Sequence, residues 1–239
     1  MPALEEILRT RPVWRGDTIV PARQAVATGF DDLDRELPGG GWPRGALTEL
    51  LAQREGFGEL QLILPALAAL TQRGRRVAWL APPHLPYAPA LAAAGLDLTH
   101  LAVVRAPGRR DALWAAEQVL RSAACEALLA WLPDARYAEL RRLAVAADEG
   151  GACLLVFRPL AAADQSSPAA LRLALEPAGE GLGVRFLKRR GRSSGAALEV
   201  KVWKPVHALG SPAFPVPAVR LVDDPSAGAD RRLGVPVHA

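Results

Sequence analysis

The residues with the clearest potential for chemistry lie between positions 48 and 60, where a strand, a glycine-containing loop and a helix are expected in succession. In a nucleotide phosphate loop of the pattern G-x-x-x-x-G-K-[ST], backbone amides hold the phosphates, the lysine neutralises them and the hydroxyl holds magnesium. Here Gly56 and Gly58 lie in the loop, but Glu59 stands at the lysine position and Leu60 at the hydroxyl position. The segment therefore has the layout of a degenerate phosphate loop, with reversed charge and no magnesium ligand.

The charge of Glu59 argues against nucleotide binding. A carboxylate about 4 Å from a phosphate repels it by about 4 kcal/mol at an effective dielectric constant of about 20, whereas a lysine attracts it by a similar amount. The same carboxylate in the first turn of a helix is stabilised by the helix dipole, by about 0.3–1 kcal/mol. We therefore expect Glu59 to cap the helix and the chain to bind no nucleotide or other cofactor. An ATPase in which Arg54 takes the role of the lysine stays open as an alternative.

Composition and hydropathy restrict the class of protein further. The chain has 239 residues, of which 50% are hydrophobic and 23% charged, enough for one sizeable globular domain. The best apolar run, 60–70, is interrupted by Gln61 and Pro65, and the N-terminus lacks the pattern of a secretory signal, so we expect a cytoplasmic protein without membrane contact. Cys125 and Cys153 lie within apolar runs, which predicts buried free thiols and no metal site.

Short apolar runs alternate with helical patterns after residue 45, which predicts a parallel sheet covered by helices on both faces. Strands are expected at 47–51, 76–81, 101–105, 127–132 and 152–157, with helices at 58–72, 88–94, 111–124 and 135–147. Strands at 171–176, 183–188 and 197–203 are expected to extend the sheet in antiparallel fashion. The predicted domain organisation is an N-terminal helix and extended lead-in over 1–45, a core over 46–204, and a proline-rich, flexible tail over 205–239.

Two segments before the loop resemble the beginning of a RecA-family ATPase core. Ala27–Asp34 is similar to the T-G-x-x-x-L-D segment of that family, and Gly39–Leu50 is similar to its G-G-x-P-x-G-x-x-x-E strand. Within the superfamily the chain resembles the ImuA group, RecA-like accessory proteins of bacterial translesion synthesis. The matching segments are Val13–Gly16, Gly56–Leu60, Leu64–Ala68 and Ala130–Pro133. The resemblance implies an α/β, RecA-like P-loop fold, with a mostly parallel central sheet flanked by helices and an antiparallel C-terminal extension.

The same resemblance locates losses of ATPase chemistry. In RecA relatives the second strand leads into a catalytic glutamate, whereas here it leads to Pro83. The strand that ends there in a metal-binding aspartate ends here in Trp131. Together with Glu59, three positions depart from the family pattern, so the resemblance implies no catalytic residue and no metal site. We therefore expect a protein that is not an enzyme.

By this resemblance the chain is a non-catalytic adaptor in DNA-damage-induced mutagenesis, the translesion synthesis branch of the SOS response. Its implied partners are an ImuB-type, Y-family-like polymerase protein, an error-prone replicative-type polymerase, RecA and single-stranded DNA, with nucleoid association when engaged. The alternative from another class is a cell-division inhibitor of the SulA type, which shares an ATP-free RecA-related fold and binds the tubulin-like division protein.

Several further residues are candidates for contacts with partners or for the core. A basic cluster at an expected hairpin tip either binds DNA phosphates or keeps a sheet edge soluble. The cluster comprises Lys188, Arg189, Arg190 and Arg192. The apolar candidates for partner binding, in the N-terminal helix, the lead-in and the tail, are Leu4, Ile7, Leu8, Trp14, Phe214 and Val216. The tryptophans expected to pack in the interior are Trp42, Trp79, Trp114, Trp131 and Trp203.

Overall fold

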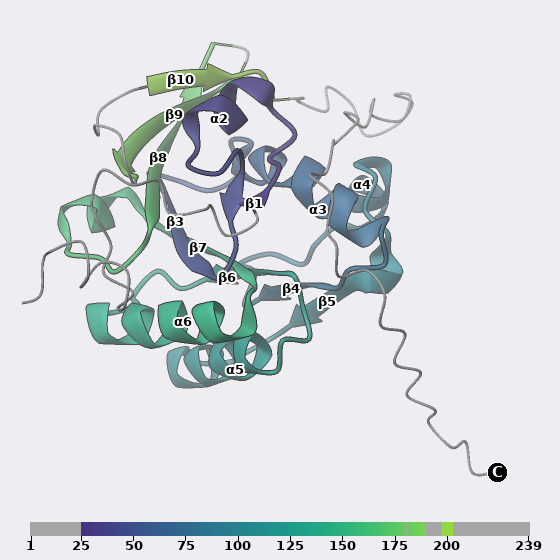
Figure 1. Cartoon of the computed structure of the whole chain (residues 1–239), viewed down its shortest axis with the longest axis vertical. Coiled ribbons are helices and arrows are strands. Elements are labelled where there is room, and N and C mark those ends of the chain that lie inside the picture. Colours follow the sequence, from purple (N-terminus) through teal and green to yellow (C-terminus); the bar gives the residue numbers. More distant parts are fainter. Residues whose placement is uncertain (1–24, 180, 190–196, 203–239) are drawn as a thin grey trace, which may run out of the picture.

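A mixed sheet of eight strands forms the centre of the part of the chain that the computed structural model describes, residues 25–179, 181–189 and 197–202 (Figure 1). Its strand order is β10-β9-β8-β3-β7-β6-β4-β5. The strands from β8 to β5 run parallel, and β9 and β10 continue the sheet in antiparallel fashion. The strand bounds are β3 Ala46–Ala52, β4 Val77–Leu80, β5 Leu101–Val104, β6 Ala127–Trp131, β7 Cys153–Pro159, β8 Leu171–Ala178, β9 Gly181–Lys188 and β10 Ala197–Val200.

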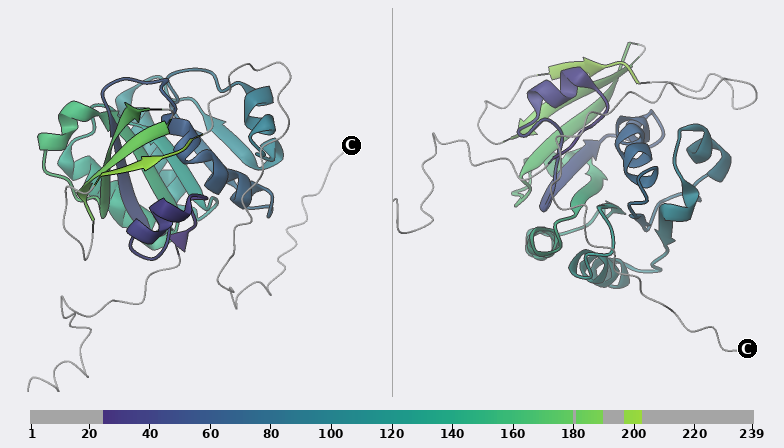
Figure 2. Two further views of the ribbon diagram at one scale, coloured as in Figure 1. Left: turned by 90° about the horizontal axis from the view of Figure 1, so that it is seen from above. Right: turned by 45° about the vertical axis from the view of Figure 1, so that its right-hand side comes forward.

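Helices cover both faces of this sheet (Figure 2). On one face lie α2 Asp31–Glu36, α3 Leu64–Thr71 and α4 Ala88–Ala93, and on the other lie α5 Arg109–Arg121 and α6 Tyr137–Gly150. A hydrophobic core lies on each face of the sheet. The strands contribute side chains to both cores, because successive side chains of a strand point to opposite faces. In β6, for example, Leu129 packs in the core under α3 and Leu128 in the core under α5 and α6.

The remaining short elements connect the sheet and the helices or lie beside them. A small ladder of β1 Ala25–Val26 and β2 Trp42–Pro43 brings the lead-in against the core, where Trp42 is 1% exposed. Short 3-10 helices are η1 Glu59–Leu62, η2 Leu98–His100 and η3 Leu160–Asp164. The described part of the lead-in therefore packs onto the sheet, on the side of α2 and α3.

Within the predicted core, two elements differ from the prediction. The helix expected over 58–72 is split into η1 and α3, because Pro65 stands in the first turn of α3 and Ile63 before it has a φ of −109°. Proline favours the beginning of a helix and lacks the N–H needed inside one. The strand expected to begin an antiparallel extension, β8, instead runs parallel to β3, so the antiparallel part begins at β9. The other core helices and strands lie within a few residues of the predicted ranges.

The RecA-like P-loop class predicted for the fold is wrong. The sheet is mixed, and the loop after β3 is not a phosphate loop with a free N–H cradle followed by a long α-helix. It leads into a 3-10 helix of four residues, and its amides are already bonded to a side chain of the same chain. The physical reason is the glutamate at the lysine position, described below.

No helix among the residues described is long and apolar enough to cross a membrane. The N-terminal helix expected around Leu4, Ile7 and Leu8, and the tail with Phe214 and Val216, lie outside the described residues, as does Trp14. Arg190 and Arg192 of the basic cluster also lie outside them.

Candidate functional site

The carboxylate of Glu59 occupies the loop that the sequence marks as a degenerate phosphate loop. Its Oε1 accepts a hydrogen bond from the amide of Gly56 at 2.8 Å, and its Oε2 accepts hydrogen bonds from the amides of Phe57 and Gly58, each at 3.1 Å. Gly56 and Gly58 have φ values of 78° and 116°, in the region that glycine adopts without steric cost. This backbone turns three successive N–H groups toward one anion, and the anion is a side chain of the loop itself.

This arrangement places the chain's own carboxylate where a phosphate loop holds a nucleotide phosphate. Glu59 is only 8% exposed, so a second anion would have to displace it from three donors and would meet a like charge on the way. Leu60 follows in η1 without a hydroxyl group. The geometry therefore fits a loop closed on itself better than a loop awaiting a nucleotide.

The two other positions at which ATPase residues are missing lie at the same edge of the sheet. Pro83 follows β4 and Trp131 ends β6, and the carboxyl ends of neighbouring parallel strands share an edge with the loop after β3. Trp131 stacks on Phe157, with ring centroids 4.7 Å apart, and lies 5.7 Å from Trp79. An aromatic cluster thus occupies the end of β6, where a metal-binding aspartate would stand in a RecA-type ATPase.

A buried ion cluster in the sheet was not predicted from the sequence. Glu49 of β3 has no exposed surface, and its carboxylate accepts hydrogen bonds from Arg158 Nη1 at 2.7 Å and from Arg172 Nε at 2.6 Å. The two guanidinium groups also donate to the carbonyl oxygens of Ala135 and Ala162. The cluster ties β3, β7 and β8 to η3 and to the segment before α6. A glutamate inside an apolar strand is the sequence signal that could have indicated it, because a buried charge needs a partner.

The structure places the described part of the basic cluster against the chain itself. Arg189 donates from Nη1 to Glu36 Oε2 at 2.6 Å, its guanidinium lies 4.4 Å from the ring centroid of Phe186, and its side chain is 5% exposed. Lys188 Nζ donates to the carbonyl oxygen of Ser167 at 3.1 Å. Arg189 therefore holds β9 to α2, and its charge is already compensated by a carboxylate.

The two cysteines lie in the core as free thiols. Burial raises the pKa of Cys125 to about 11 and that of Cys153 to about 12. Within the described ranges, no group of three or more His, Cys, Asp or Glu side chains gathers in a way that could hold a metal ion.

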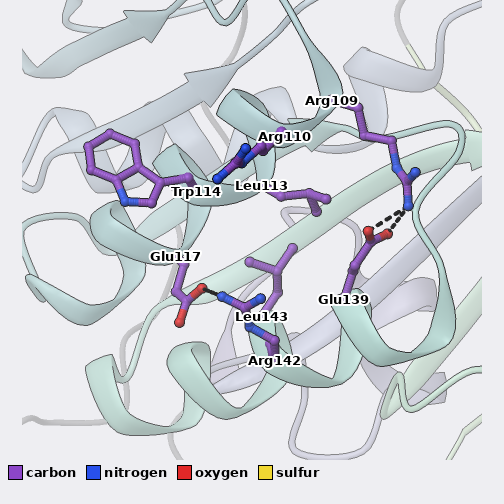
Figure 3. A pocket seen from close by; sticks show the side chains of 8 residues that line it. All are labelled: Arg109, Arg110, Leu113, Trp114, Glu117, Glu139, Arg142 and Leu143. Carbon is purple, nitrogen blue, oxygen red and sulfur yellow. Dashed lines mark hydrogen bonds and ion pairs between the residues drawn. The ribbon is translucent and has the colours of Figure 1, made fainter.

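The outer face of α5 and α6 carries a groove of about 520 Å³ (Figure 3). Leu143, which is 1% exposed, and the half-buried Leu113 line it with apolar surface, and Trp114 stands beside them. Trp114 was expected to be buried, but it is 64% exposed, because it faces away from the sheet on α5. By contrast, Trp42 and Trp79 are almost fully buried, as predicted.

Two ion pairs connect the helices across this groove. Arg109 of α5 pairs with Glu139 of α6, and Arg142 of α6 pairs with Glu117 of α5 (Figure 3). The guanidinium of Arg109 and the amide of Arg136 lower the pKa of the Glu139 carboxyl, against a desolvation that raises it. Arg110 lies on the same rim, and among the described residues it has no carboxylate partner.

A smaller hollow of about 360 Å³ lies at the ends of β4 and β5, along the loop that contains Pro83. In this loop Leu85 is 74% and Tyr87 is 64% exposed. His84 Nε2 lies 3.5 Å from Glu55 Oε2, which connects the loop to the one that contains Glu59. Ala81 begins the loop with a φ of 48°, a left-handed conformation unusual for alanine.

These features together define an α/β protein. The loop after β3 is closed by the carboxylate of Glu59, and the outer face of α5 and α6 carries an exposed groove. A family model described as cell division inhibitor SulA matches residues 45–154. The cell division inhibitor SulA of Edwardsiella piscicida is 32% identical over 109 residues, which cover 44% of this chain and 65% of that protein. The crystal structure of SulA from Pseudomonas aeruginosa is 27% identical, over 47% of this chain and 97% of that one, with a TM-score of 0.41. The chain spans less than two thirds of the length of the curated relative.

The comparisons correct the family suggested by the RecA-like segments. The match is to SulA and not to the ImuA group, so the resemblance to ImuA is wrong as an assignment. The translesion synthesis adaptor inferred from it, and its ImuB-type and polymerase partners, are wrong for the same reason. The alternative, a SulA-type inhibitor, agrees better with these matches.

Proposed function

We propose that this chain is an inhibitor of cell division that acts in the cytoplasm by binding the tubulin-like division protein FtsZ. The observation that carries the proposal is the similarity to cell division inhibitor SulA, found over residues 45–154 and at 32% identity to one relative. The matched segment begins at the edge of β3 and ends in β7, so it includes the Glu59 loop, α5 and α6.

The chemistry of the Glu59 loop supports a role that is not catalytic. Three loop amides bond the carboxylate of Glu59, and Trp131 stacks on Phe157 at the end of β6, so neither place offers a ligand set for a nucleotide and its magnesium ion. A protein of this kind acts by occupying a surface of its partner. Inhibition should therefore depend on stoichiometry and should not depend on ATP.

A sedimentation experiment tests the proposal. The division protein of the same organism is polymerised with GTP, the purified full chain is titrated in, and the polymer in the pellet is measured with and without ATP. We expect the pelleted fraction to fall as the chain approaches an equimolar ratio, to the same extent in both conditions. A pellet that is unchanged at tenfold molar excess would overturn the proposal, and a fall that requires ATP would overturn its non-catalytic part.

A further inference from the structure

The groove between α5 and α6 combines an apolar floor with an exposed aromatic side chain and with Arg110, which pairs with no carboxylate among the residues that the structure describes. We propose that this groove binds the division protein, and that the segment it accepts carries an apolar side chain next to a carboxylate. The inference rests on the proposed function and adds to it the surface and the chemistry of recognition. The similarity to SulA does not single out this surface, because the matched residues 45–154 include other exposed segments.

Trp114 gives the groove an exposed aromatic side chain. A tryptophan on a helix of an α/β protein normally packs toward the sheet, but this one is 64% exposed beside Leu113 and Leu143. Side chains that dominate binding energy at protein interfaces are most often Trp, Tyr and Arg, set in places from which water can be excluded. An apolar side chain entering a groove of about 520 Å³ next to Trp114 would be shielded in this way.

Arg110 gives the groove its excess positive charge. The other arginines of the groove, Arg109 and Arg142, already pair with Glu139 and Glu117 across the two helices (Figure 3). Arg110 forms no ion pair with a carboxylate in the part of the chain that the structure describes. The groove is therefore left with one excess positive charge. A carboxylate on the partner complements this charge, and electrostatic complementarity of this kind sets orientation and specificity.

The position of the groove on two packed helices also favours it over the loop with Leu85 and Tyr87. The helices α5 and α6 pack on each other through buried side chains such as Leu120 and Leu143, and two ion pairs join them, so the partner does not have to order the walls of the groove. The loop, although exposed and apolar, forms a smaller hollow of about 360 Å³. The exposed Tyr87 of this loop therefore serves as the matched control for Trp114 of the groove.

The first test compares two aromatic side chains with equal exposure. Trp114→Ala removes the groove aromatic and Tyr87→Ala removes the loop aromatic, and each side chain is 64% exposed in the native chain. The dissociation constant for the purified division protein is measured by titration calorimetry with the full-length chain. We expect Trp114→Ala to raise it by about thirtyfold or more and Tyr87→Ala to change it by less than about threefold. Equal melting temperatures of the two variants show that folding is not the cause.

The second test compares two charge reversals on neighbouring helices. Arg110→Glu reverses the charge of the groove arginine that has no carboxylate partner in the described part of the chain, and Arg141→Glu makes the same change at an exposed position of α6 that does not line the groove. We expect Arg110→Glu to weaken binding by about tenfold or more, and Arg141→Glu to have less than about a twofold effect. The native affinity should fall with added salt, and the Arg110→Glu affinity should fall less.

The outcomes separate the inference from the proposed function. If the native chain does not bind the division protein, the proposed function fails and the inference fails with it. If the native chain binds and the two groove variants bind equally well, the groove inference alone is overturned. The same conclusion follows if Tyr87→Ala is the variant that loses binding, or if Trp114→Ala changes only the self-association of the chain.

Discussion

The amide of Gly56 donates a hydrogen bond to Glu59 Oε1 over 2.8 Å, so that a side chain three residues further along closes the loop after β3. The amides of Phe57 and Gly58 complete the set of donors through Oε2. The same bonds explain why η1 is a short 3-10 helix, since Glu59 bends back over the residues that precede it. The loop therefore keeps a defined shape with no bound anion.

Removal of the Glu59 carboxylate should destabilise the protein. Glu59→Ala leaves three loop amides without their acceptor, and because the loop is partly exposed, water replaces some of these bonds. We expect a loss of about 1–3 kcal/mol in the free energy of unfolding, measured by urea denaturation. Glu55→Ala, in the same loop and near the exposed His84, serves as the control and should change stability by less than about 0.5 kcal/mol. Equal stability of the two variants would show that the three bonds do not hold the loop.

The buried Glu49 should matter more than any surface charge. Glu49→Gln keeps the shape of the side chain but leaves Arg158 and Arg172 without a buried counter-charge. We expect the free energy of unfolding to fall by about 3–5 kcal/mol, because an uncompensated buried charge is costly. Asp32→Ala breaks the exposed pair with Arg35 and should cost no more than about 1 kcal/mol in the same denaturation experiment. Similar losses in both variants would contradict this account.

The secondary structure of the core could be predicted from the sequence because its signals are local. Short apolar runs and helical periodicity placed β4, β5, β6, α5 and α6 within a few residues of their observed bounds. The direction of β8 could not be predicted in this way, because it depends on which strand β8 pairs with after the crossover through η3. The break between η1 and α3 lies at Ile63 and Pro65, and the apolar periodicity that predicts one helix over 58–72 does not report it, because Ile63 continues the apolar run.

In the candidate sites too, local features could be predicted from the sequence and features that depend on tertiary contacts could not. The residue type at position 59 sets the sign of the loop's charge, but the three bonds from the loop amides to the Glu59 carboxylate could not be predicted from it. The outward position of Trp114 could not be predicted, because an amphipathic helix places a tryptophan on either side of its boundary with solvent. The RecA-like segments before β3 led to the wrong family because motifs that shape a strand and its turns do not determine a partner.

The two thiols should make stability fall in alkaline solution. Burial raises the pKa of Cys125 from 9.0 to about 11 and that of Cys153 from 9.0 to about 12, so the unfolded chain releases these protons first. Their contribution is fully present below about pH 9 and is lost as the pH rises toward the folded values. Between pH 9 and 10 we expect a loss of about 1 kcal/mol per thiol.

The control for this pH dependence is the double variant Cys125→Ala, Cys153→Ala. Its stability is lower at every pH because it loses core packing, but it lacks the alkaline loss that the thiols cause. Urea denaturation of both proteins at pH 8, 9 and 10 measures the difference. Parallel curves of stability against pH for the two proteins would show that the thiols are not the cause.

The last turn of α6 approaches α5 so closely that only glycine fits at residue 150. A Cβ atom on Gly150 would overlap the carbonyl oxygen of Leu120, which is backbone and cannot move aside as a side chain can. Gly150→Ala gains up to about 1 kcal/mol of helix propensity. The overlap costs about 1–3 kcal/mol, because the two helices must separate. We therefore expect a net loss of stability in urea denaturation, although alanine is the better helix former. Glu149→Ala, at the exposed neighbouring position, is the control and should change stability by less than about 0.5 kcal/mol. A Gly150→Ala protein more stable than the native chain would show that α5 and α6 separate there without strain.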